Sequence, residues 1–201
     1  MREPVNLLLA SSNRGKLEEY VELAQGARIH LQAMPEFDLL PPFEESAATF
    51  AENAAGKALH YSHFSTVEVI AEDSGLVVPA LGGAPGPKSQ RYAGPGATDA
   101  MRIARLLGEM AGKRGDDRRA RFVCVLALAR AGRIRAIFSD ASEGVLLDTP
   151  RGQTGFGYDA VFLTETLGKT FAELTRRQKN EISHRGKAFH KLLSFLDSSE
   201  Q

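Results

Sequence analysis

The sequence has one cysteine, no excess of either charge and no long run of apolar residues. The single Cys124 excludes an intrachain disulfide and a metal site built from several cysteines. The 25 basic and 25 acidic residues give a net charge of zero, which argues against non-specific binding to nucleic acid or to a membrane surface. The longest apolar run, Phe122–Ala129, is far too short to span a membrane. The apolar residues of Val5–Ala10 are too few for the core of a signal peptide, so we expect a cytoplasmic protein.

The composition that is present is typical of a globular α/β protein. The chain has 201 residues, of which 43% are hydrophobic and 25% charged, so we expect one domain over residues 1–201, with room for two lobes. Apolar runs and residue spacing predict strands at Val5–Ala10, Ile29–Ala33, Val69–Ala71, Arg121–Arg130, Arg133–Phe138 and Glu143–Leu147. They predict helices at Leu17–Ala24, Thr49–Phe64 and Thr98–Met110, and another after Ser183.

The centre of the sequence carries two acids at the end of a short apolar strand. Glu72 and Asp73 directly follow Val69–Ala71, and Ser74 and Gly75 then interrupt the pattern. Carboxylates at the end of a buried strand are costly without a partner, and a divalent cation is a common strong partner. Solvated acids at an ordinary strand end are the alternative interpretation.

Two further segments carry polar groups suited to binding an anion. A Gly-containing turn with small hydroxyls and a lysine separates the first strand from the first helix, which is typical of an anion cradle; a plain capped turn is the alternative. That turn consists of Ser11, Ser12, Asn13, Arg14, Gly15 and Lys16. On the helix Thr49–Phe64, Asn53 and Lys57 share a stripe with apolar residues, which indicates either a polar cleft or a lysine that reaches past the sheet edge.

The last third of the chain contains an aromatic residue between glycines and a cationic helix start. Gly155–Ala160 fits a dinucleotide-binding pattern, but no helix is expected after it, so that interpretation fails. Phe156 could instead stack on a base or plug the loop into the core. His184 and Arg185 begin a helix, where positive charge opposes the helix dipole, and this indicates an anionic or carbonyl-bearing ligand nearby.

Taken in order, these motifs resemble the inosine triphosphatase-like, non-standard purine NTP pyrophosphatases over Val5–Leu196. The resemblance implies an elongated, twisted mixed sheet flanked by helices, two lobes around a central cleft, and a homodimer. It implies Mg²⁺-dependent hydrolysis of ITP, dITP and XTP to the monophosphate and pyrophosphate, which cleanses the nucleotide pool. The motifs that carry it are Ser11–Lys16, Glu44–Ser46, Thr49–Ala54 with Lys57 and Ala58, Ala71–Leu76, Leu81–Gly86, Ser89–Gly94, Gly155–Asp159 and Ser183–Lys187.

The resemblance also implies a role for each site residue. The substrate would be held by Ser11, Ser12, Asn13, Arg14, Gly15, Lys16, Asn53, Lys57, Ser74, Phe156, Gly157, Tyr158, Asp159, Lys179, His184 and Arg185. Glu44 and Asp73 would hold the metal, with Glu72 as a further candidate ligand, and Asp73 would also accept the proton.

Three departures from the family pattern concern this site. Glu72 stands where aspartate is frequent, Ala47 replaces a glycine after the acid pair, and Ala160 replaces a proline. Two other functions stay open. One is pyrophosphate release from other modified nucleoside triphosphates, and the other is nucleotide binding without catalysis.

Overall fold

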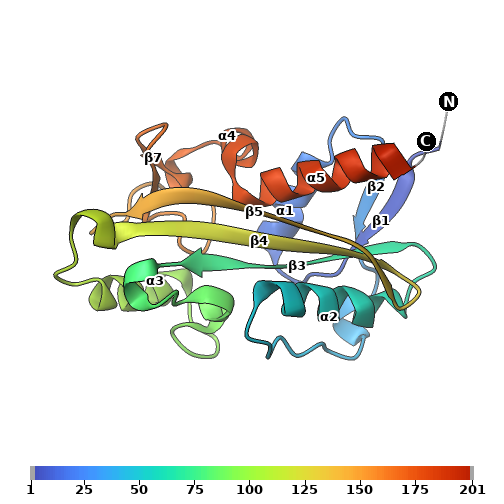
Figure 1. Ribbon diagram of the computed structural model, residues 1–201, viewed down its shortest axis with the longest axis horizontal. Helices are drawn as coiled ribbons and strands as arrows, with labels where there is room; N and C mark the ends of the chain where they lie inside the picture. Colours follow the sequence, from blue (N-terminus) through green and yellow to red (C-terminus); the bar gives the residue numbers. More distant parts are fainter. Residues whose placement is uncertain (1–2, 200–201) are drawn as a thin grey trace. The chain divides into compact units, whose positions relative to one another are not determined.

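The computed structural model describes residues 3–199 as an α/β fold in two compact units (Figure 1). The first unit comprises Met1–Asp73, Cys124–Asp140 and Arg185–Gln201, and the second comprises Ser74–Val123 and Ala141–His184. The α/β class is confirmed, whereas the cleft between lobes stays a prediction.

A mixed sheet of seven strands runs through the described residues in the order β2-β1-β3-β4-β5-β6-β7. Its strands are β1 (Val5–Leu9), β2 (Ile29–Ala33), β3 (Glu68–Val77), β4 (Arg119–Arg130), β5 (Arg133–Leu146), β6 (Phe162–Thr164) and β7 (Lys169–Thr170). β1 pairs in parallel with β2 and with β3, whereas β6 is antiparallel to both β5 and β7. The turn between β4 and β5 is the expected hairpin, since Ala131 and Gly132 both have positive φ, as a two-residue hairpin loop requires.

In the first unit, helices cover both faces of the strands. The helices are α1 (Arg14–Leu23), α2 (Phe50–Ser62) and α5 (His184–Ser199), and Figure 1 shows α1 and α5 on one side of the strands and α2 on the other. Tyr20 from α1 and Phe189 from α5 join Leu7, Ile70 and Leu126 of the strands in one apolar core. The opposite face receives Ala54 and other buried residues of α2.

The second unit contains the helices α3 (Asp99–Glu109) and α4 (Arg176–Ile182). Its core joins Leu106 of α3 to Leu76, Phe122, Phe162 and Phe171. Thr175 begins α4 with a capping box, because its side chain accepts from the backbone of Gln178 and the Gln178 side chain accepts from the backbone of Thr175.

The sequence prediction was wrong about continuity in two strands. The expected break at Ser74 and Gly75 is absent, and β3 runs unbroken from Glu68 to Val77. The two strands expected within 133–147 are one strand, β5. Polar and small residues interrupt an apolar pattern without interrupting the backbone hydrogen bonds that make a strand. The helix α4 and the strands β6 and β7 were not foreseen.

Candidate functional site

The register of β1 against β3 brings two of the expected motifs together. Leu9 of β1 pairs with Ile70 of β3, and the Ala10 N–H donates to the Ile70 carbonyl at 2.9 Å. Both strands run in the same direction, so the turn after β1 and the acids after Ile70 lie at the same end of the sheet. The anion-cradle turn is therefore beside Glu72 and Asp73.

The turn starts α1 with a side-chain cap. Asn13 is the N-cap, and its Oδ1 accepts from the Lys16 N–H at 3.0 Å. Ser11 Oγ accepts from the Asn13 N–H at 3.2 Å and shapes the residues before the helix. Both interpretations of the turn are compatible with this geometry, because a capped helix start also presents backbone N–H groups and a positive dipole end to an anion.

Asp73 lies on the α2 side of β3, where it is only 4% exposed. Its Oδ2 accepts from Asn53 Nδ2 at 2.9 Å, and Asn53 Oδ1 accepts from the Ala47 N–H at 3.0 Å. Burial raises the pKa of Asp73 to about 6, and the nearby Glu45 also raises it; the Asn53 bond, Lys16 and Lys57 act in the opposite direction. A carboxylate with this pKa is one that an added cation or proton would stabilise.

The side chain of Lys57, from α2, lies near Asp73. Its Nζ forms an ion pair with Glu45 and donates to the Glu72 carbonyl oxygen at 3.1 Å. The Lys57 side chain is 13% exposed and that of Glu45 is 24% exposed, so the pair is largely shielded from water. Of the two alternatives for Lys57, the structure shows it among acids rather than reaching past the sheet edge.

Glu72 points to the opposite face of β3 from Asp73. Both of its carboxylate oxygens accept from Arg185, at 2.7 Å and 2.8 Å, and Oε2 also accepts from Tyr20 Oη at 2.5 Å. Lys16 Nζ lies 3.1 Å from Oε1, and Arg185 also bonds to Glu19. Glu72, Glu19 and Arg185 are each at most 3% exposed, so this is a buried, satisfied ion network.

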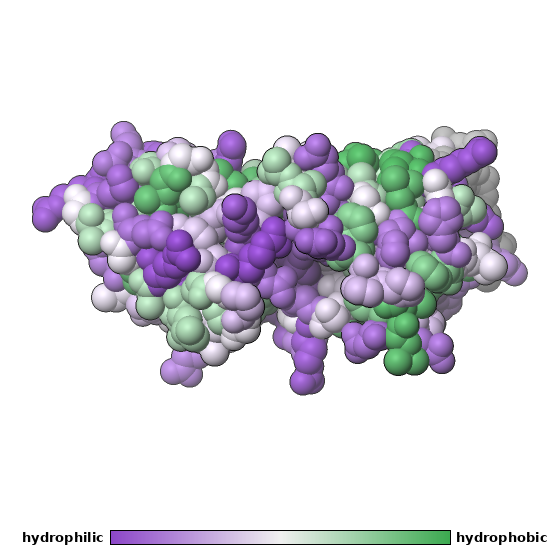
Figure 2. All heavy atoms as spheres, turned by 90° about the horizontal axis from the view of Figure 1, so that it is seen from below, coloured by the Kyte–Doolittle hydropathy of each residue, from purple (hydrophilic) through white to green (hydrophobic). Residues whose placement is uncertain are grey.

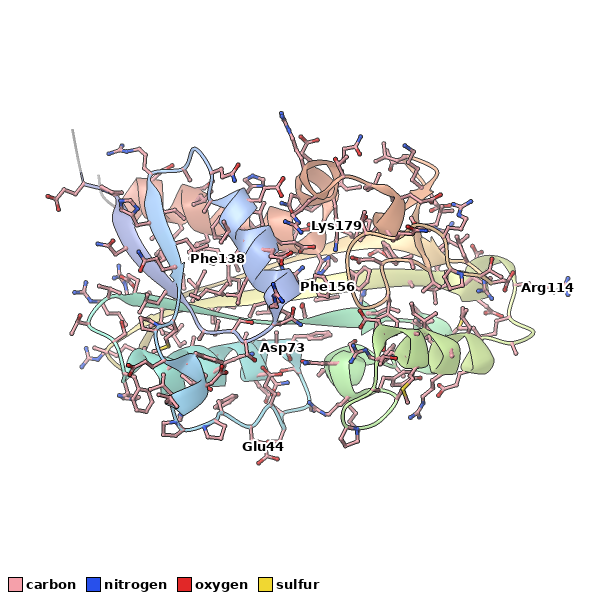
Figure 3. All side chains as sticks on the ribbon, turned by 180° about the vertical axis from the view of Figure 1, so that it is seen from behind. Glu44, Asp73, Arg114, Phe138, Phe156 and Lys179 are labelled. Carbon is pink, nitrogen blue, oxygen red and sulfur yellow. The ribbon has the colours of Figure 1, made fainter. Side chains whose placement is uncertain are left out.

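The second unit gathers aromatic and charged groups around Lys179. Lys179 Nζ lies 2.5 Å from Asp159 Oδ2, and it also lies 4.9 Å from the ring centroid of Phe156 and 5.6 Å from that of Phe171. Asp159 Oδ2 also accepts from the Phe156 N–H at 2.9 Å, which fixes the loop that carries Phe156. Lys179 is 3% exposed, whereas Phe156 is half-buried. Figure 3 labels Phe156 and Lys179 in this unit.

His184 belongs to a stack of rings in the same unit. Its imidazole lies 4.8 Å from the Phe122 ring at an interplanar angle of 9°, and Phe122 stacks on Phe171 at 5.7 Å. The side chain is 3% exposed. Stacking on Phe122 holds the plane of the imidazole in one orientation.

Comparison with known proteins decides the family. The profile of the Ham1 family matches residues 7–195. The chain belongs to the Ham1 family. It is 48% identical over 190 residues to a dITP/XTP pyrophosphatase of Gloeobacter violaceus, covering 94% of this chain and 92% of that protein. It is 45% identical over 186 residues to a dITP/XTP pyrophosphatase of Geobacillus kaustophilus, covering 92% and 91% of the two chains. The structure of a HAM1 protein from Coxiella burnetii superposes with a TM-score of 0.86 at 41% identity, covering 96% and 99% of the two chains.

The structure places the expected site residues of this Ham1 chain in two groups. The first unit holds Ser11, Ser12, Asn13, Arg14, Gly15, Lys16, Glu44, Asn53, Lys57, Glu72, Asp73 and Arg185, and the second holds Ser74, Phe156, Gly157, Tyr158, Asp159, Lys179 and His184. Within the first unit, Asp73 contacts Asn53, and Lys16 and Arg185 both contact Glu72. Within the second, Phe156, Asp159 and Lys179 meet.

Three residues that were expected to bind metal or substrate have surroundings of a different kind. Glu44 is exposed, and Figure 3 shows it extending away from Asp73, while its neighbour Glu45 is the acid that reaches Lys57. Tyr158 is 3% exposed and donates to the Ser89 carbonyl at 2.9 Å, so it plugs the loop into the core. Arg185 is buried against Glu72 and Glu19, which supplies an internal reason for a cation at the start of α5.

Sequence reasoning included Glu45 in the motif Glu44–Ser46 but gave the metal role to Glu44, and it missed Tyr20 and Glu19. Glu44 and Glu45 are adjacent acids on an irregular segment, so no periodicity indicates which one turns inward. Glu19 and Tyr20 follow Lys16 by three and four residues, and this spacing places them near Lys16 on one side of the helix. That spacing was a usable signal.

The acids around Asp73 are the candidate ligands for a metal ion. Among residues 3–199, no group of three or more His, Cys, Asp or Glu side chains is arranged to hold an ion. Mg²⁺ needs fewer protein ligands, because it keeps several waters and is commonly bound by one or two carboxylates plus substrate phosphates. Asp73 and Glu45 fit this requirement; Glu72 fits poorly, because both of its oxygens already bind Arg185.

No helix within residues 3–199 combines the length and apolar character needed to cross a membrane.

Proposed function

We propose that this protein hydrolyses non-standard purine nucleoside triphosphates, namely ITP, dITP and XTP, to the nucleoside monophosphate and pyrophosphate. The observation that carries the proposal is the convergence of Asp73, Lys57 and Lys16 beside the N-terminus of α1, where a triphosphate and a water could both be held. The names of the relatives, dITP/XTP pyrophosphatases, support the same reaction and substrates.

In the proposed reaction, the first unit holds the phosphates and activates water. Lys16, Lys57 and the backbone N–H groups that begin α1 bind the triphosphate oxygens. Asp73 accepts a proton from a water whose oxygen attacks the α-phosphorus. The bond from that phosphorus to the bridging oxygen breaks, and pyrophosphate leaves. Mg²⁺, when bound by Asp73 and a second acid, would supply neutralisation of the phosphate charge.

The second unit recognises the base in this proposal. Phe156 stacks on the purine, for which about 1–3 kcal/mol per base is typical. Lys179 and His184 donate to the 6-oxo group, which adenine lacks. An adenine nucleotide would leave these donors unpaired, and such mismatches cost up to about 10⁴–10⁵ in discrimination. Arg185 is held by Glu72 in the core of the first unit, so this proposal gives it no contact with the base.

A substrate panel tests the proposal. ITP, dITP, XTP, GTP, ATP and dTTP are each incubated with the protein and Mg²⁺, and pyrophosphate release is measured. We expect kcat/KM for ITP, dITP and XTP to exceed that for ATP by at least about 10²-fold, because adenine lacks the 6-oxo group, and also to exceed that for GTP. Preference for the pyrimidine nucleotide dTTP, or nucleotide binding without pyrophosphate release, would replace the proposal with one of its two alternatives.

The metal, the assembly and the location complete the proposal. We propose Mg²⁺ as the cofactor, a homodimer as the assembled form and the cytoplasm as the location, where the nucleotide pool is found. Light scattering should give twice the chain mass of 21.8 kDa. EDTA should abolish turnover, and added Mg²⁺ should restore it.

A further inference from the structure

Glu45 occupies the position that a phosphate oxygen would take on Lys57. Its Oε1 contacts Lys57 Nζ, and the pair is largely shielded from water, with side-chain exposures of 24% and 13%. If Lys57 binds the triphosphate, as the proposed function requires, the incoming phosphate must displace this carboxylate. An ion pair in a partly dry site is stronger than the same pair on the surface, so the displacement carries a cost in binding free energy.

The segment that carries Glu45 is tied to Asp73. The Ala47 N–H donates to Asn53 Oδ1 at 3.0 Å, and Asn53 Nδ2 donates to Asp73 Oδ2 at 2.9 Å. Glu45 is two residues from Ala47, so a displaced Glu45 carboxylate stays within reach of Asp73. A divalent cation at Asp73 would then give the displaced carboxylate a new partner.

We propose that Glu45 is an internal counter-anion that makes Lys57 accept a polyphosphate only together with a divalent cation. Without the cation, phosphate and Glu45 compete for one ammonium group. With it, Glu45 turns to the cation and Lys57 is free for phosphate. The two ligands therefore bind with positive coupling, and the coupling passes through Glu45. This residue selects the metal-bound substrate over bare phosphate anions. The inference rests on the proposed function for the use of Lys57.

Calorimetric titration with inorganic pyrophosphate tests the inference, once in EDTA and once in Mg²⁺. The wild-type protein should bind pyrophosphate weakly in EDTA and far more tightly in Mg²⁺. Glu45→Gln removes the competing charge, so its affinity in EDTA should rise by roughly fivefold to tenfold. The gain in affinity on adding Mg²⁺ should shrink in the same variant.

Glu44→Gln is the matched control, because it removes the same charge from the residue next to Glu45, whose side chain is exposed in the case of Glu44. Its affinity for pyrophosphate in EDTA should stay within about twofold of the wild type. In a Lys57→Met background, Glu45→Gln should give no further gain, because the ammonium group for which Glu45 competes is absent.

Two outcomes overturn the inference. An unchanged affinity of Glu45→Gln in EDTA would show that Glu45 does not compete for Lys57. An equal rise for Glu44→Gln would show a general charge effect instead. Both outcomes can be told apart from a failure of the proposed function. In that case the wild-type protein would not bind pyrophosphate even with Mg²⁺.

Discussion

Glu72 and Asp73 are adjacent on β3, and the alternation of an extended strand sends them to opposite faces. Glu72 turns toward Tyr20 and Arg185 and becomes part of a neutralised core network. Asp73 turns toward Asn53 of α2 and keeps a raised pKa. Two adjacent positions on one strand therefore differ in kind: Glu72 is a structural acid, and Asp73 is a catalytic candidate.

Replacing Asp73 by asparagine should remove the proton acceptor. A general base contributes roughly 10²–10⁴-fold, so kcat for ITP should fall by at least about 10²-fold in Asp73→Asn. Pyrophosphate release is the measurement, and calorimetry should still detect nucleotide binding. Near-normal turnover would exclude Asp73 from the chemistry.

The same variant should be more stable than the wild type in metal-free buffer above pH 6. The folded state raises the pKa of Asp73 from 3.8 to about 6, so its contribution to stability is present below the unfolded pKa and lost as pH rises toward 6. The rise of the pKa from 3.8 to about 6 corresponds to a loss of about 3 kcal/mol, and asparagine escapes it. The melting temperature of Asp73→Asn minus that of the wild type should grow from pH 4 to pH 6 and then level off. A difference that is constant over this range would contradict the pKa assignment.

Arg185 should matter mainly to stability. Removing one partner of a buried ion network typically costs about 3–5 kcal/mol, because the remaining charges stay buried. Arg185→Met leaves Glu72 and Glu19 without this cation, and urea unfolding measures the loss. Arg177→Met is the control: its ion pair with Glu181 is exposed, so it should cost less than about 1 kcal/mol. Equal effects of the two variants would contradict this role for Arg185.

At the scale of elements, β3 needs a glycine at position 75 because the segment Gly86–Arg91 approaches the strand closely there. A Cβ at Gly75 would lie 2.3 Å from Ser89 Oγ and 2.6 Å from the Gly86 carbonyl oxygen. Ser89 Oγ meanwhile accepts from the Leu76 N–H at 2.9 Å and donates to the Gly86 carbonyl at 2.6 Å. The glycine lets the strand and the turn share these hydrogen bonds.

Gly75→Ala should therefore destabilise the protein by about 1–3 kcal/mol through overpacking. Gly108→Ala is the matched change on the exposed side of α3, where an added Cβ meets no atom within 4 Å. It should stabilise the helix by up to about 1 kcal/mol. Urea unfolding of both variants gives the comparison, and a loss of the same size in each would refute the close-approach argument.

At the scale of the whole molecule, charge is balanced globally and concentrated locally. The net charge is zero, and Figure 2 shows one face on which hydrophilic and apolar residues are mixed. Under the proposed function, the affinity for a polyphosphate would therefore come from local groups such as Lys16 and Lys57, rather than from the overall charge of the protein.

Pyrophosphate with Mg²⁺ should raise the melting temperature of the whole chain. A ligand at 100 times its dissociation constant adds about 2.7 kcal/mol. At roughly 2–4 °C per kcal/mol for a chain of this size, the shift should be about 5–10 °C. Differential scanning calorimetry is the measurement, with Mg²⁺ alone and pyrophosphate in EDTA as controls. The absence of any shift at saturating concentration would contradict a polyphosphate site.

Local signals in the sequence predicted most of the elements. β1, β2, α2, α3 and the β4–β5 hairpin follow from periodicity and turn residues, which act over a few neighbours. The helix α4 was also within reach, because Thr175 and Gln178 have the spacing of a capping box. The sequence prediction interrupted β3 and divided β5 into two strands, and both errors show what local signals cannot predict. Whether a strand continues depends on its hydrogen-bonded partners elsewhere in the sheet.

By itself, the sequence determined that Glu72 and Asp73 end an apolar run, that lysines and glycines accompany them, and that the motifs together match one family. Only the tertiary structure decided the partner of each charge. Arg185 reaches Glu72 across 113 residues, and Asn53 reaches Asp73 across 20. The choice between Glu44 and Glu45 depends on a loop held by Asn53. Side-chain pairing over such separations depends on the packing of whole elements, and no local pattern encodes it.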